Sequence, residues 1–235
     1  MTPLKKFDIE FMKPGTSTRS VLLGLLLVVL NCYWIMISLM FGGGESATIT
    51  LIYNVVFSLF VLIGGNLILL RYLPQFAFRQ GELLTIYVML NIASIIASHF
   101  TLQILIPIIP HAFRFATPEN EWSILITRYI PNGFAIDDPK VFDNFYRGNS
   151  TFYTRPHFRG WLKPILVWSG FLSALLLGML GVNAVLRKQW TEQEKLSYPL
   201  IQLPLEMTAP SQRLLRNKLM WLSFTFAFGI NLLNG

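Results

Sequence analysis

Long runs of uncharged, mostly apolar residues alternate with short charged segments along this chain of 235 residues. An α-helix needs about 20 such residues to cross a bilayer, and four of the runs are at least that long. The pattern therefore predicts an all-α, polytopic helical membrane protein with four full transmembrane helices and a partial fifth. The runs that predict these helices are residues 20–44, 46–70, 83–113, 164–186 and 219–235.

Glycine and proline residues predict where two of these helices end. Gly42, Gly43 and Gly44 close the first run, and glycine commonly terminates helices. The third run is longer than one span requires. Because Pro107 and Pro110 remove backbone donors, we expect this helix to cover about residues 83–106 and to stop before the prolines.

Basic residues lie unevenly between the runs, and this predicts an orientation. They gather in the N-terminal tail, the second short loop and the last loop, whereas the first short loop has none. The positive-inside rule then predicts a cytoplasmic N-terminus, for a multi-pass protein that we expect in the cell (inner) membrane. The predicted parts are a cytoplasmic tail (1–19), helices one to three (20–111), an extracytoplasmic loop region (112–160), helix four (161–186), a cytoplasmic loop (187–218) and the start of helix five (219–235). Because the fifth run stops before it is long enough for a full span, the chain is expected to be an N-terminal fragment of a longer protein.

The extracytoplasmic loop region is rich in aromatic residues, which predicts short helices and turns rather than disorder. Asn120 and the pair Asn132 and Gly133 are expected at turns. Asp137 and Asp138 could together bind a cation. However, an aspartate followed by Pro139 is also a common helix start, and we expect Asp138 to cap a helix there.

Composition agrees with a membrane protein and narrows the function. Only 13% of the residues are charged, against about 25% in soluble proteins. The net charge of +7 comes from basic residues beside the apolar runs, so topology explains it and no nucleic-acid partner is expected. The single cysteine, Cys32, excludes an internal disulfide and a cysteine metal site. Zinc-protease, serine-hydrolase and phosphate-loop motifs do not occur, so no cofactor or metal is expected and an enzyme is the less expected class.

His99 is a candidate substrate-binding residue because it lies inside the third apolar run. An ionisable group at membrane depth is a functional hypothesis by default. The alternative is a neutral histidine that is hydrogen-bonded to a neighbouring helix. In either case we expect the ring to face the helix bundle rather than lipid. Asn54 and Asn66, in the second run, are expected to join helices by hydrogen bonds rather than to bind substrate.

The segment 186–207 supplies the other candidate residues. Its second half, residues 196–205, is uncharged but too short to span a bilayer. We predict that Pro199 is the first residue of a helix that Ser197 caps and that enters the protein from the cytoplasmic side as a re-entrant element. Ser197, Tyr198 and Pro199 would then meet an anionic solute at the helix N-terminus.

The alternative for this segment is an amphipathic helix that lies in the membrane interface. In that arrangement Gln202 and Glu206 face water, because a carboxylate at membrane depth would be costly.

Several segments resemble a family of uncharacterised bacterial polytopic membrane proteins that is similar to the oligopeptide transporter superfamily. They are residues 81–90 (GELLTIYVML), 117–122 (TPENEW), 161–168 and 194–199 (EKLSYP). The last of these, after Arg187 and Lys188, resembles the Lys-Leu-Thr-Tyr-Pro motif of yellow-stripe-like metal–chelate transporters, although Leu200 and Ile201 replace the Ser-Gly of that motif. The resemblance implies a secondary transporter of small solutes, of oligopeptide or metal-chelate type. Its expected partners are the lipid bilayer, a small solute and either a missing C-terminal half or further copies of the chain.

Two other classes of function stay open. A membrane-embedded assembly or scaffold protein could bind a partner through the aromatic loop region. A lipid-linked glycosyltransferase-like enzyme would be expected to carry paired acidic residues in the first outer loop, where this chain offers only Glu45.

Overall fold

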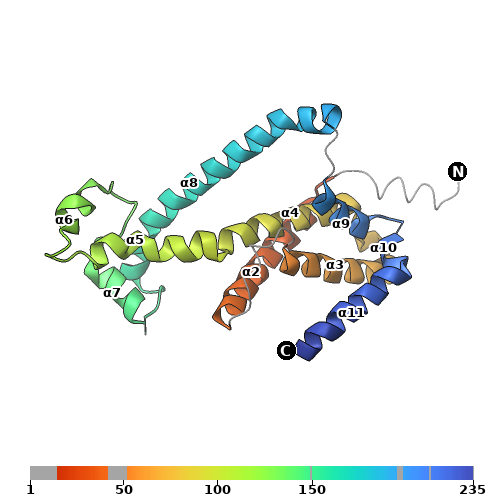
Figure 1. The fold of residues 1–235 in the computed structure, drawn as a ribbon, viewed down its shortest axis with the longest axis horizontal. Helices are drawn as coiled ribbons and strands as arrows, with labels where there is room; N and C mark the ends of the chain where they lie inside the picture. Colours follow the sequence, from red (N-terminus) through yellow and green to blue (C-terminus); the bar gives the residue numbers. More distant parts are fainter. Residues whose placement is uncertain (1–14, 42–51, 149, 195–197, 212, 235) are drawn as a thin grey trace. The chain divides into compact units, whose positions relative to one another are not determined.

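The computed structural model describes residues 15–41, 52–148, 150–194, 198–211 and 213–234 (Figure 1). Over these residues the chain is helical and contains no strand, which confirms the all-α prediction. Four of the described helices are long and apolar enough to cross a membrane. They cover Thr18–Met40, Tyr53–Tyr72, Gln80–Arg114 and Arg155–Gln193, and α11 (Lys218–Asn234) corresponds to the predicted partial fifth. The chain is therefore a multi-pass membrane protein.

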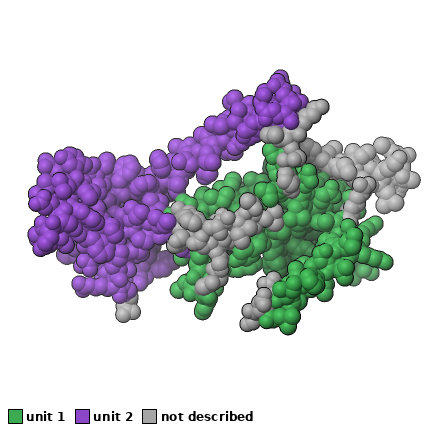
Figure 2. Space-filling model, in the orientation of Figure 1, with its two compact units in different colours: residues 1–101, 198–235 green, residues 102–197 purple. Residues whose placement is uncertain are grey.

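The helices form two compact units, coloured separately in Figure 2. The first unit consists of residues 1–101 and 198–235, and the second of residues 102–197. The boundary in sequence falls inside the third candidate span, directly after Thr101.

The first unit is built on three helices, α2 (Thr18–Met40), α3 (Tyr53–Tyr72) and α4 (Gln80–Ala97), with α4 packed against the other two. Val55, Ile86 and Leu90 are buried in the shared core. At Gly24 the helices approach so closely that a Cβ atom would lie 2.6 Å from Met89 Sδ. Small residues at such crossings let membrane helices gain van der Waals contact without a hydrophobic driving force.

The C-terminal helices complete this unit. They are α9 (Pro199–Thr208), α10 (Arg213–Arg216) and α11. α9 packs against α3 and α4, and its Met207 is buried with Leu59, Ile63 and Leu83. The segment after the fourth candidate span thus returns to the first three helices.

The third candidate span is broken earlier than predicted. α4 ends at Ala97, a π-helical turn covers His99–Gln103, and α5 (Ile104–Arg114) contains both Pro107 and Pro110. The prediction that the prolines end the helix is therefore wrong. In a regular α-helix the Pro107 ring would clash with the carbonyl of Gln103, four residues earlier. Gln103 is the last residue of the π-helical turn, so the backbone is irregular at the position where this clash would occur.

The fourth candidate span also differs from its prediction, because α8 begins at Arg155 and continues to Lys188. Thr154 is the N-cap and a proline stands in the first turn. Pro164, the first residue of the apolar run, lies inside the helix. The apolar run marks the part of the helix suited to lipid, whereas the cap and the early proline mark where the helix starts.

The other predicted helix ends are closer to the structure. α2 ends at Met40, and the three glycines expected to terminate it lie outside the described residues. α3 ends at Tyr72, two residues after the predicted limit, and begins at Tyr53, whereas residues 46–51 of its predicted start lie outside the described part.

The second unit contains the loop region, which folds as expected into short helices and turns: α6 (Trp122–Leu125), a 3₁₀ turn (Thr127–Tyr129) and α7 (Pro139–Arg147). Asn120 lies in a turn and accepts bonds from the Thr117 and Trp122 amides at 2.9 and 3.1 Å. Asn132 and Gly133 also form a turn. Asp138 caps α7 by accepting a bond from the Lys140 amide at 2.9 Å, which confirms the predicted cap.

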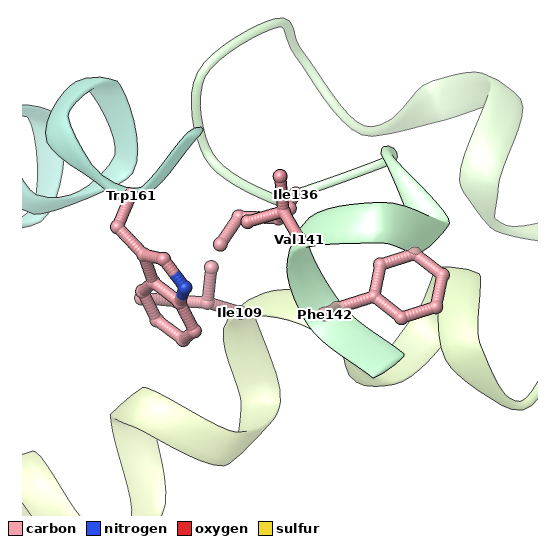
Figure 3. Close-up of a cluster of buried hydrophobic side chains, with 5 residues drawn as sticks. All are labelled: Ile109, Ile136, Val141, Phe142 and Trp161. Carbon is pink, nitrogen blue, oxygen red and sulfur yellow. The ribbon is translucent and has the colours of Figure 1, made fainter. Parts of the chain in front are cut away.

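A small apolar core joins the helices of the second unit, as Figure 3 shows. Its buried members come from α5, from the loop before α7, from α7 and from α8: Ile109, Ile136, Val141, Phe142 and Trp161. The Tyr146 hydroxyl adds a polar link by donating to the Pro107 carbonyl at 2.7 Å. Burial raises the pKa of the Tyr146 phenol, so the hydroxyl remains protonated as a donor.

Candidate functional site

Three polar side chains meet inside the first unit, one from each of its central helices. Asn31 on α2, Asn54 on α3 and Ser94 on α4 are each at most 3% exposed. Asn31 Nδ2 donates to Ser94 Oγ at 2.8 Å, and Asn54 Nδ2 donates to Asn31 Oδ1 at 2.7 Å and to Ser94 Oγ at 3.2 Å. We call these three residues the polar cluster.

The polar cluster lies deep along α2 and α4. Arg19 on α2 bonds Glu82 on α4 near the starts of both helices, so α2 and α4 run in the same direction. Asn31 and Ser94 follow those starts by 13 and 14 residues. At 1.5 Å per residue both lie about 20 Å along their helices, whereas Asn54 is the second residue of α3.

One atom of the polar cluster has no hydrogen-bond partner among the described residues. It is Asn54 Oδ1, which is buried. Turning the amide round would only exchange the unpartnered oxygen for an unpartnered nitrogen, because the other end already meets Asn31 and Ser94. Buried polar groups without a partner cost free energy, so this oxygen is poised to accept a bond from a hydroxyl, an ammonium group, water or a small cation.

At the start of the bundle, a second set of polar groups is fully partnered. Arg19 Nε and Nη2 lie 3.0 and 2.9 Å from the two carboxylate oxygens of Glu82. The same carboxylate accepts bonds from the Ser17 hydroxyl and, at 2.7 Å, from the Arg79 amide. Arg19 also donates to the Ala77 carbonyl at 3.0 Å. This set ties α2 to the connection between α3 and α4 and leaves no carboxylate oxygen for a ligand.

Asn66 has a packing role, as expected, but its partner is the backbone of the connection between α3 and α4 rather than another helix. Its Nδ2 donates to the Phe78 carbonyl at 3.0 Å and its Oδ1 accepts from the Phe78 amide at 2.6 Å. Both bonds hold the segment before α4 against α3. Asn54, its counterpart in the prediction, does bond across helices but keeps the unpartnered oxygen.

The predicted site residues fall elsewhere. His99 lies in the π-helical turn, and its side chain is outside the described part, so the direction of its ring stays a prediction. Ser197 also lies outside the described residues. α9 begins at Pro199, as predicted, but its N-cap is Tyr198 rather than Ser197, and the Tyr198 side chain makes no capping bond.

Neither Asn31 nor Ser94 is among the site residues predicted from the sequence. Asn31 is the only amide side chain in the first apolar run, which is the signal that could have identified it. Ser94 carries no such signal, because serine is tolerated in membrane helices through bonds to its own backbone. Only the packing of α4 shows that Ser94 meets two amides.

The two faces of α9 differ. Gln202 and Glu206, one turn apart, are exposed, whereas Leu203 and Met207 pack in the core of the first unit. At the end of α9, Gln80 Nε2 on α4 donates to the Leu205 carbonyl at 3.3 Å. The exposed residues of α9 also include the apolar side chains of Leu200, Ile201 and Leu205, so the interfacial and the re-entrant alternatives both stay open.

Within the described residues no three His, Cys, Asp or Glu side chains are grouped as a metal site.

Comparison with known proteins identifies a family but no activity. The chain matches no curated protein and no solved structure. A family model described as a family of unknown function (DUF6785) matches residues 12–235. Since that match covers nearly the whole sequence, the chain belongs to the DUF6785 family.

Proposed function

We propose that this multi-pass membrane protein is a secondary transporter of a small solute, of oligopeptide or metal-chelate type, and that the polar cluster forms part of its solute path. The observation that carries the proposal is the buried Asn54 Oδ1, which has no partner among the described residues and lies among helices long and apolar enough to cross a membrane. Polar groups in this position are expensive and are commonly retained for binding or passage of a polar solute.

The origin of the three side chains supports the same proposal. They come from three separate helices, so any movement of one helix against the others changes the bonds within the polar cluster. A transporter needs such a change between its two access states, because the solute must meet different partners in each. A structural amide in a static bundle would be expected to have all its bonds satisfied.

Uptake into proteoliposomes tests the proposal. The probes are labelled tetra-alanine, for the oligopeptide type, and radioactive iron(III) citrate, for the chelate type. We expect uptake of one probe above that of protein-free vesicles and a loss of about tenfold or more in Asn54→Leu, which keeps the side-chain size but removes the polar groups.

Asn91→Leu is the matched control. Asn91 lies on α4, but its amide donates to the Tyr87 carbonyl of its own helix at 2.8 Å. Its variant should keep the uptake of the unaltered protein. Uptake of neither probe, or equal uptake by Asn54→Leu and the unaltered protein, would contradict the proposal. A scaffold protein would also tolerate Asn54→Leu as long as it folds.

A further inference from the structure

The second unit contains a cleft of about 490 Å³ beside the first turns of α8. Arg159, Gly160, Lys163 and Pro164 of α8 line it, together with residues of the loop 130–138. Ile136 and Val141, two members of the apolar core in Figure 3, form part of its wall. A volume of this size suits a small organic ligand.

Charges of both signs line this cleft. Arg159 and Lys163 are one helical turn apart on α8, and Asp137 and Asp138 belong to the loop before α7. None of the four side chains forms an ion pair with another described residue. One oxygen of Asp138 is occupied by the Lys140 amide, whereas the Asp137 carboxylate accepts no bond from the described residues. The cleft thus offers two free cations and a free carboxylate.

The stem of Lys163 is positioned by the loop. Gly133 has φ +99°, and a Cβ atom there would lie 2.7 Å from Lys163 Cε. The lysine stem therefore packs directly over the glycine backbone, and its ammonium group can reach the cleft rather than bulk water. The backbone angle at this point favours glycine, because other residues rarely adopt a positive φ.

The position of the cleft along α8 indicates the level of lipid headgroups. Pro164 lines the cleft and is also the first residue of the 23-residue uncharged run, 164–186. Trp168 lies one turn further along α8, and its Nε1 donates to the Phe134 carbonyl at 2.9 Å. Tryptophan and basic residues at the end of a span are typical of the membrane interface.

We propose that this cleft binds a zwitterion with a phosphate and an ammonium group, as found in the headgroup of phosphatidylethanolamine. Arg159 and Lys163 would hold the phosphate oxygens, and Asp137 would accept bonds from the ammonium group. Mixed charge favours this ligand over a simple anion, because the two aspartates would repel an anion that brings no cation. The proposal does not depend on transport.

Native mass spectrometry of the purified, detergent-solubilised protein tests the proposal by counting bound short-chain lipids. Phosphatidylcholine lacks N–H donors on its cation, and phosphatidylglycerol lacks the cation. We expect phosphatidylethanolamine to bind about tenfold more tightly than either. Arg159→Gln/Lys163→Gln should weaken the binding of all three lipids by about tenfold, and Asp137→Asn should reduce phosphatidylethanolamine to the level of phosphatidylglycerol.

Arg155→Gln, one turn before Arg159 on the same helix and outside the cleft, should bind like the unaltered protein. Competition with soluble glycerophosphoethanolamine separates the two sources of the ligand: displacement at equal concentration indicates a free solute, and its failure indicates the membrane lipid. Equal binding of the three lipids, or an unchanged Asp137→Asn protein, would overturn the proposal. Asp137 is exposed, so this variant stays informative even if the double variant fails to fold.

Discussion

At the scale of single residues, the loss of Arg19 and the loss of Glu82 are expected to destabilise the protein to different extents. The Glu82 side chain is 4% exposed, whereas that of Arg19 is 43% exposed. Removing the arginine leaves a buried carboxylate with two weaker donors, Ser17 and the Arg79 amide. Removing the carboxylate leaves a guanidinium group that can still reach water. The cost of losing one partner therefore depends on which partner is lost.

We predict that Arg19→Gln lowers the free energy of unfolding by about 2 kcal/mol, and Glu82→Gln by about 1 kcal/mol. The arginine is partly solvated, so its effect lies below the range for fully buried pairs. Thermal unfolding in detergent measures both, and the double variant completes a cycle in which the pair should be non-additive. A larger loss in Glu82→Gln than in Arg19→Gln would contradict this account.

Residues whose role is set by near neighbours could be predicted from the sequence. Asp138 and Pro139 start a helix through local effects, because Asp138 accepts from the Lys140 amide and Pro139 has no amide hydrogen that would need a partner. The partners of Ser94 lie 63 and 40 residues away, on other helices, and nothing local specifies them. Of the polar cluster, only Asn54 was singled out from the sequence, and there it was expected to join helices rather than to bind substrate.

At the scale of the helices, apolar runs predicted the number of spans correctly but not their limits. Hydropathy reports which residues suit lipid, whereas helix ends depend on caps and backbone bonds. α8 accordingly starts at Arg155, well before its apolar part, and α5 includes two prolines that a local rule treats as breaks. The π-helical turn His99–Gln103 has no simple sequence signature and was not predicted.

α9 allows a direct test of its two faces. In a Cys32→Ser background, we predict that Gln202→Cys and Glu206→Cys react quickly with a membrane-impermeant thiol reagent, whereas Met207→Cys is protected by at least about tenfold, because Met207 is 6% exposed. The measurement is the labelling rate in membrane vesicles open at the cytoplasmic face. Protection of all three positions would favour the re-entrant reading, in which the polar face meets protein.

At the scale of the whole molecule, the first unit brings its basic residues to one end. The starts of α2 and α4 are joined by Arg19 and Glu82, and α3 ends at Tyr72, a few residues before α4. Arg19, Arg71 and Arg79 therefore share this end of the bundle. By the positive-inside rule this end is expected to be cytoplasmic, and the orientation stays a prediction.

Reporter fusions test this orientation. Alkaline phosphatase joined after Phe145, in α7, should be active because that position is predicted to lie outside the cytoplasm. The same reporter joined after Phe76, between α3 and α4, should be inactive. A reversed pair of activities would place the N-terminus outside and would also place the cleft beside the first turns of α8 on the cytoplasmic side.

The polar cluster has a further consequence for how the three helices find their alignment. Apolar membrane helices can slide along one another at little cost, because lipid solvates each offset equally well. A shift of one helix by a single turn, about 5.4 Å, would separate Asn31, Asn54 and Ser94 and leave several amide groups in hydrocarbon. The same three side chains thus select one register during assembly. Asn54→Leu, the substitution expected to reduce uptake, is therefore also expected to let the helices settle at more than one offset.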